Sequence, residues 1–117
     1  MSDRQPVELF FGDDTYPFHL TPDLVLELER KVGTGIGAIY RRFIRQEFGF
    51  GDLTETLRLG LIGGGMGPAD AATLVNAYAP RLTVTELFLS ALPVLDALMT
   101  APLQPVAKSP RTKRPAK

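Results

Sequence analysis

The stretch RLGLIGGGMGPADAATLV, residues 58–75, places four glycines within positions 63–67, directly before a helix-like run. Glycine-rich loops of this kind cradle phosphate groups in nucleotide-binding enzymes. In a Walker loop a lysine and a hydroxyl side chain follow the last glycine, whereas a proline and an alanine follow Gly67. A dinucleotide-binding loop must follow a strand, and the residues before Gly63 have a helical pattern. We therefore predict that this run connects two helices and binds no cofactor.

The other residues that could do chemistry are few. GTGIG, residues 33–37, has the wrong spacing for a dinucleotide fingerprint and follows no predicted strand. The chain has no cysteine and one histidine, His19, which excludes thiolate and two-histidine metal sites. Asp13 and Asp14 could be paired catalytic carboxylates, but aspartate beside glycine is typical of a tight turn. The sequence predicts no catalytic residue and no metal site.

Four apolar side chains are the candidates for binding a protein partner. Phe48 and Phe50 flank a glycine in a predicted flexible connector, where aromatic residues are either part of the core or anchors for another chain. Leu87 and Phe88 lie on the apolar stripe of the last predicted helix. We expect these four residues to contact a long helical client through apolar helix faces.

Three arginines, Arg41, Arg42 and Arg45, form a compact basic stripe on the second predicted helix. Such a stripe can contact an acidic partner or nucleic acid. The alternative is a set of ion pairs within the chain, with Glu27, Glu29 or Glu47 as partners.

The elements that position these residues start with a hairpin. Residues 7–20 begin with an apolar run, turn at residues 12–14 and then alternate, so that Tyr16, Phe18 and Leu20 share one sheet face. A first helix is expected after Thr21, with proline in its first position, and should end at the glycine at position 33. These features predict a two-stranded sheet that helices must cover.

Four further helices are expected. The second covers about residues 36–47, and the third restarts where Asp52 and Glu55 stand at capping-box spacing. The fourth covers about residues 68–79, and the fifth begins with a second capping box, Thr83 and Glu86. Pro93 should kink the fifth helix or split it in two.

These elements indicate the α+β class, with an N-terminal β-hairpin followed by about five α-helices. We expect residues 1–100 to form a single domain. Residues 101–117 are rich in proline and basic side chains, which predicts a disordered tail. The N-terminus does not resemble a secretory signal and no apolar run is long enough to cross a bilayer, so we expect a cytoplasmic protein without a membrane partner.

Charge is distributed unevenly along the chain. It has 13 basic and 13 acidic side chains, but residues 108–117 hold five basic side chains and no acid, which leaves residues 1–107 with a net charge of −5. An acidic body argues against nucleic acid as a partner. The basic tail and the arginine stripe nevertheless support an alternative function, a small DNA-associated regulatory protein.

The order and spacing of these segments resemble the tail-assembly-chaperone family of phages and gene transfer agents. The matching pieces cover roughly residues 7–100: a hairpin around FFGDDTYPFHLTPD, then LVLELERKVGTGIGAIYRRF, FGDLTETLRLGLIGGG, PADAATLVNAYAP and TELFLSALPVLDALM. The resemblance implies structural roles for the positions that match the family pattern: Glu29, Gly33, Gly35, Arg42, Gly60, Gly63, Gly64 and Gly65.

The resemblance also implies a non-enzymatic function. Members of this family are small proteins encoded between the tail-tube and tape-measure proteins; they hold the tape-measure protein in solution, recruit tail-tube subunits around it and are absent from the finished particle. The implied partners are thus the tape-measure protein and the tail-tube protein, and a homo-oligomer is compatible with this role. The residues alone also favour a binding protein, because a small acidic helical body without a catalytic constellation is not typical of an enzyme.

Overall fold

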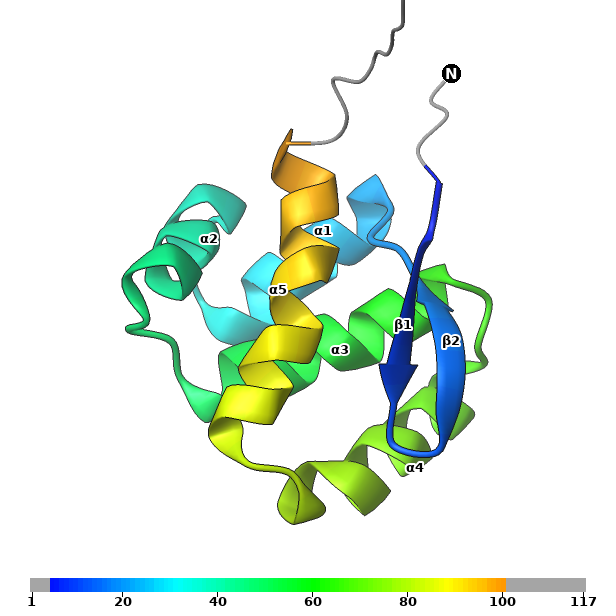
Figure 1. Cartoon of the computed structure of the whole chain (residues 1–117). Helices are drawn as coiled ribbons and strands as arrows, with labels where there is room; N and C mark the ends of the chain where they lie inside the picture. Colours follow the sequence, from blue (N-terminus) through cyan, green and yellow to red (C-terminus); the bar gives the residue numbers. More distant parts are fainter. Residues whose placement is uncertain (1–4, 101–117) are drawn as a thin grey trace, which may run out of the picture.

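Residues 5–100 are described in the computed structural model, as two strands and five α-helices. The predicted α+β fold of a hairpin followed by five helices is confirmed (Figure 1). The predicted disordered tail, residues 101–117, lies outside the described residues. In chain order the elements are β1 (Val7–Phe11), β2 (Asp14–Phe18), α1 (Pro22–Val32), α2 (Ile36–Arg45), α3 (Phe50–Gly63), α4 (Pro68–Tyr78), a short 3-10 helix η1 (Ala79–Arg81) and α5 (Val84–Thr100).

The two strands form an antiparallel hairpin with a two-residue loop, Gly12 and Asp13. Gly12 has a φ of 73°, the left-handed region that tight hairpin loops commonly need. The register places Val7 opposite Phe18. Phe11 and Phe18 are both buried, so one face of the hairpin is covered by helices, as the alternation predicts.

A side chain caps the start of α1 and a glycine ends it. The Thr21 hydroxyl accepts a hydrogen bond from the Leu24 amide at 3.3 Å, and the helix ends at Gly33, as predicted. The Glu29 carboxylate then accepts a hydrogen bond from the Ile36 amide at 2.8 Å, across the turn between α1 and α2. This bond satisfies one of the amides that a helix leaves without a partner in its first turn. It therefore fixes where α2 begins.

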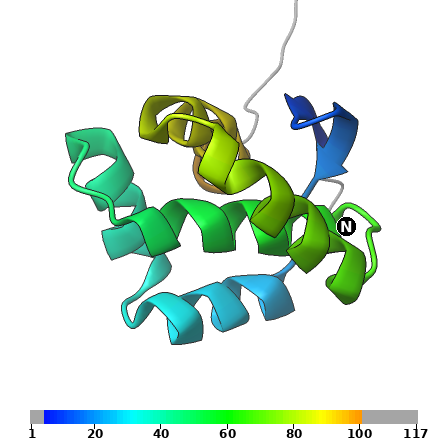
Figure 2. The same ribbon diagram turned by 90° about the horizontal axis from the view of Figure 1, so that it is seen from below.

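Helix α3 is the centre of the fold. It contacts α1, α4, α5 and β2, and Figure 2 shows it running between α1 and α5. Its leucines lie four apart and are fully enclosed by these neighbours. The most deeply buried large side chains come from six elements: Phe11, Phe18, Leu28, Ile39, Phe43, Leu53, Leu57, Leu61, Leu87 and Leu95.

Three element boundaries differ from the sequence-based prediction. Helix α2 ends at Arg45, because Gln46 adopts a left-handed φ of 58°. Helix α3 begins at Phe50, so Asp52 is its third residue and not its cap. Helix α5 runs unbroken through Pro93, so of the predicted kink or split the split does not occur.

The continuity of α5 has a local explanation. A proline within a helix removes the amide that would bond the carbonyl four residues earlier, here that of Leu89. Leu89 is 59% exposed, so the carbonyl that Pro93 leaves without a donor belongs to a residue on the solvent side of α5. The capping box predicted at the start of this helix is confirmed: the Thr83 hydroxyl and the Glu86 carboxylate each accept a hydrogen bond from the other residue's amide, at 3.0 Å and 2.8 Å.

Candidate partner-binding surface

A cluster of three aromatic rings joins α2, the connector between α2 and α3, and α5. Phe48 stacks on Phe88 with ring centroids 4.9 Å apart and planes 14° apart, and Phe43 contacts both rings at 5.8 Å and 6.0 Å. Phe43 is fully buried, whereas Phe48 and Phe88 are half-buried. Phe48 and Phe88, two of the predicted partner-binding residues, therefore lie together, each with one side on the core and one side toward solvent.

Asp52 holds the connector in place from the first turn of α3. Its carboxylate accepts a hydrogen bond from the Gly49 amide at 2.8 Å and two more from the Arg42 guanidinium, both at 3.1 Å. Asp52 is only 5% exposed, so these charge-assisted bonds replace the water that burial removes. The connector residues 46–49 are thus anchored on α2 at one end and on α3 at the other.

Phe50 and Leu87 have opposite environments. Phe50 opens α3 and is 54% exposed, whereas Leu87 is fully buried in the core and out of reach of a partner in this conformation. Val84, which the sequence reasoning did not single out, is 50% exposed and lies one helical turn before Phe88 on the same face of α5. We call Phe48, Phe50, Val84 and Phe88 the aromatic edge.

The glycine run allows the end of β2 to lie directly on the end of α3. The His19 amide donates a hydrogen bond to the Gly60 carbonyl at 2.9 Å. A Cβ atom at Gly63 would lie 1.7 Å from the His19 carbonyl oxygen, and one at Gly64 would lie 1.9 Å from that of Pro17. The predicted helix-to-helix connection is confirmed, and its glycines also form a contact surface for β2.

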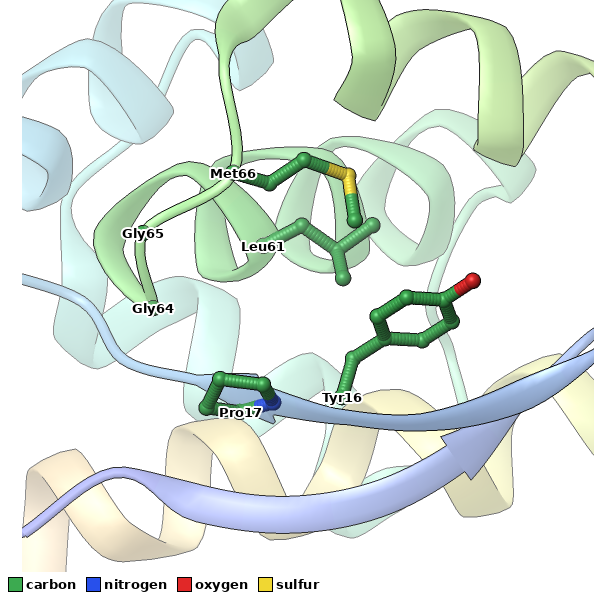
Figure 3. Close-up of a pocket in the computed structure, with 6 residues that line it drawn as sticks. All are labelled: Tyr16, Pro17, Leu61, Gly64, Gly65 and Met66. Atoms are coloured by element: carbon green, nitrogen blue, oxygen red, sulfur yellow. The ribbon is translucent and has the colours of Figure 1, made fainter.

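Beside this contact lies a hollow of about 290 Å³, shown in Figure 3. Its lining offers no basic side chain to a phosphate group. The Tyr16 hydroxyl donates a 2.6 Å hydrogen bond to the Asp13 carboxylate in the hairpin loop. The lining consists of Tyr16, Pro17, Leu61, Gly64, Gly65 and Met66.

Asp13 and Asp14 serve the hairpin turn, as predicted. Asp13 accepts the Tyr16 hydrogen bond, and the Asp14 carboxylate accepts one from the neighbouring Thr15 amide at 2.7 Å. His19 is half-buried at the end of the hairpin. Within residues 5–100, no group of three or more His, Asp or Glu side chains is placed to hold a metal ion.

The bond to Asp13 and partial burial raise the pKa of Tyr16 from 10.0 to about 12. An unfolded chain would ionise this phenol first, so the stability that the bond provides is present below pH 10 and lost as the pH rises through about 12. The hydrogen bond to Asp96 raises the pKa of Tyr40 as well, so we expect an absorbance titration of tyrosinate to lose only the Tyr16 part of the late ionisation in Tyr16→Phe. Asp13→Asn should return the pKa of Tyr16 toward 10.0; an unchanged titration curve would contradict the assignment.

Comparison with known families finds a match over most of the chain. A family model described as phage tail tube protein, GTA-gp10, matches residues 4–101. The chain belongs to this family. No curated protein and no solved structure matches it. Membership establishes a role connected with the tail of a phage or gene transfer agent.

In this tail-family protein, most of the positions implied to be structural make packing or capping contacts. Glu29 caps α2, Arg42 binds Asp52, and Gly33 ends α1. A Cβ at Gly60 would lie 3.1 Å from the Phe18 ring, so this position also keeps β2 close to α3.

Within residues 5–100, one arginine of the stripe forms an ion pair and the other two form none. Arg42 pairs with Asp52, and not with any of the three glutamates considered from the sequence. Glu27 pairs with Arg30 on its own helix. Arg41 and Arg45 are exposed, and no salt bridge joins them to another of residues 5–100.

The DNA-associated alternative gains no support from the described part of the chain. Residues 108–117, on which it chiefly depends, lie outside that part. Residues 5–100 carry seven basic and twelve acidic side chains, a net charge of −5 that repels a nucleic acid backbone. None of the helices in residues 5–100 is both long and apolar enough to cross a membrane.

Proposed function

We propose that this protein is a cytoplasmic, non-enzymatic tail-assembly chaperone that binds the tape-measure protein and recruits tail-tube subunits to it. Family membership supports the connection with the tail, and the segment order supports the chaperone role within it. The observation that carries the client-binding part of the proposal is the aromatic edge, where Phe48 and Phe88 stack and Phe50, two residues after Phe48, is 54% exposed.

The aromatic edge suits a helical client. Exposed aromatic side chains supply large apolar contact area with few rotatable bonds, which makes them frequent anchors in protein interfaces. Phe48 and Phe88 are held by their mutual stacking, and the hydrogen bond that the Gly49 amide donates to Asp52 fixes the chain just before Phe50. An apolar helix face laid across this edge would cover Phe50 and Val84, both half or more exposed in the chain alone.

The test is co-purification of the intact chain with the tape-measure and tail-tube proteins encoded alongside it. The native chain should retain the tape-measure protein, and Phe50→Asp should lose at least about tenfold in affinity, as expected for an interface anchor. The fold should be unaffected, because Phe50 is exposed and an acidic side chain is favourable in the first turn of a helix.

Leu26→Asp is the matched control, since Leu26 is 64% exposed and lies on α1, which contributes no residue to the aromatic edge. It should bind like the native chain. Absence of binding to both tail proteins would contradict the proposed function, and equal losses in Phe50→Asp and Leu26→Asp would contradict the proposed surface.

A tail-tube subunit is the second candidate, because the matching family is described as a phage tail tube protein. The two candidates differ in the fate of the chain. A tube subunit stays in the finished particle in many copies, whereas a chaperone leaves before completion.

A further inference from the structure

A second exposed apolar surface lies between the hairpin and α5. It is a groove of about 270 Å³ beside β1 and the first half of α5. Phe10 is 65% exposed and Leu89 is 59% exposed, and both belong to its lining. Two large apolar side chains exposed in one groove indicate a binding surface. The lining residues are Phe10, Phe11, Gly12, Leu82, Glu86, Leu89 and Ser90.

The shape of the groove suits an extended segment. Strand β1 contacts α5, whereas β2 contacts α3. One edge of β1 pairs with β2, and no other strand of residues 5–100 pairs with its second edge. Figure 1 shows β1 between β2 and α5, so the unpaired edge lies on the side of the helix. Such an edge offers backbone N–H and C=O groups to a segment that lies beside it.

The chemistry of the groove changes along its length. Helix α5 and β1 run in opposite directions (Figure 1). Leu89 lies nearer to the C-terminal end of α5, and Glu86, the acidic residue of the lining, lies about one turn closer to the start of the helix. The hairpin loop, which follows β1 toward the same end, carries the exposed Asp13 and Asp14. None of these three carboxylates forms an ion pair within the described residues. The groove therefore gains negative charge toward the start of α5.

The C-terminal part of the chain has the same order of chemistry. Residues 101–107, APLQPVA, carry no charge and contain Leu103 and Val106. Residues 108–117 hold five basic side chains and no acidic one. The two prolines of APLQPVA favour the extended conformation that aromatic-lined grooves bind. An apolar segment followed by positive charge complements a groove that becomes acidic in the same direction.

This segment is long enough to return to the groove. Thr100, the last residue of α5, follows Leu89 by 11 residues, so a rise of about 1.5 Å per residue puts it about 16 Å further along the helix. An extended segment advances about 3.1 Å per residue, so about five residues cover that distance. A reversal of direction after α5 takes roughly one or two residues more. Val106 or Ala107 would then lie level with Leu89, and Lys108 toward the acidic end of the groove.

We propose that residues 102–108 bind in the β1–α5 groove of their own chain, antiparallel to α5. Val106 would cover Phe10 and Leu89, and Lys108 would pair with Glu86. The basic side chains that follow would lie beside the acidic hairpin loop. Because the segment is tethered to the end of α5, its effective concentration at the groove is in the millimolar range, so weak contacts suffice.

Paramagnetic broadening in NMR spectra of the purified full chain tests this contact without any phage protein, so its outcome is independent of the proposed function. The chain has no cysteine, so Ala107→Cys carries a single nitroxide spin label. The label should broaden the amide signals of Phe10, Leu89 and Ser90. It should leave that of Leu26 sharp, because Leu26 belongs to α1 and α3 lies between α1 and α5 (Figure 2). Broadening spread evenly over the surface, or none at the groove, would overturn the proposal.

A mixture tests whether the contact lies within one molecule. Spin-labelled chains without isotope label are combined with isotope-labelled chains that carry no spin label, so that only contacts between molecules broaden the observed signals. The groove signals should stay sharp. Broadening at Phe10 and Leu89 in this mixture would overturn docking of the segment in its own chain.

Leu89→Arg in the spin-labelled chain tests the groove itself. It adds bulk and positive charge where Val106 should lie, so the broadening at Phe10 should be lost. Leu26→Arg is the matched control, since Leu26 is exposed to a similar degree, and it should keep the native broadening. Native broadening in Leu89→Arg, or equal loss in both variants, would overturn the proposal. The remaining signals of each spectrum check that the fold is retained.

Glu86→Gln tests the charge. Glutamine can replace glutamate in a capping box, so the start of α5 is preserved while the negative charge is removed. Broadening at the groove should be weaker in Glu86→Gln than in the native chain at low salt. Added salt should also weaken it in the native chain, because salt screens the attraction between exposed charges. Broadening that responds neither to salt nor to Glu86→Gln would overturn the pairing with Lys108.

Discussion

Gly63→Ala is expected to destabilise the fold by about 3 kcal/mol, the upper part of the range for overpacking. The added Cβ atom would lie 1.7 Å from the His19 carbonyl oxygen and 2.8 Å from its carbonyl carbon. A side chain could rotate away, but this obstacle is backbone, and the neighbouring His19 amide is bonded to Gly60. Relief therefore requires β2 and the start of α1 to move off α3, which separates the hairpin from the core.

Gly51→Ala in the same helix is the control for Gly63→Ala. Nothing lies within 4 Å of a Cβ at Gly51, so alanine should be neutral or stabilise the helix by about 0.5–1 kcal/mol. Urea unfolding of both variants measures the difference. Equal stabilities for the two variants would show that β2 does not press on the glycine run.

Asp52→Ala should cost about 2–3 kcal/mol, because it leaves the Gly49 amide and the Arg42 guanidinium without their buried acceptor. The same variant should weaken client binding, since the connector that carries Phe48 would no longer be fixed to α3. Urea unfolding and tape-measure binding are the two measurements. Full stability in Asp52→Ala would contradict the structural role given to this carboxylate.

Arg42→Ala separates the two parts of this network. The Arg42 side chain is 38% exposed, so its ion pair is partly screened by water and its loss should cost about 1 kcal/mol or less. The bond from Asp52 to the Gly49 amide remains in this variant. A larger loss in Arg42→Ala than in Asp52→Ala would place the stabilising interaction on the arginine and contradict the capping role of Asp52.

Local patterns predicted most of the fold. The threonine before α1, the proline that begins it, the capping box at Thr83 and Glu86, and the turn at Gly12 each act on residues within a few positions, so the chemistry is visible in sequence order. The aromatic pair was also visible as two candidates, Phe48 and Phe88. Their stacking was not, because 40 residues separate them and only the packing of α5 beside the connector brings them together.

Other features depended on contacts that sequence order does not reveal. The sequence predicts Asp52 as a helix cap, because it precedes an apolar run. In the structure it is the third residue of α3, where its carboxylate accepts a hydrogen bond from the cap residue Gly49 and binds Arg42 on α2. The sequence predicts the glycine run at Gly63 as a simple connection between helices, because no neighbouring residue in the sequence indicates that the end of β2 packs against it. Leu89 could have been noticed, as a large apolar residue outside the buried stripe of its helix.

The composition of the finished particle tests the central claim most directly. Quantitative mass spectrometry would compare this protein with the tail-tube and tape-measure proteins, in cells that are assembling particles and in particles purified from them. A chaperone should be present with the tape-measure protein during assembly and absent from the purified particle. Recovery of the chain from purified particles in the same copy number as tube subunits would contradict the chaperone proposal and establish a tube subunit.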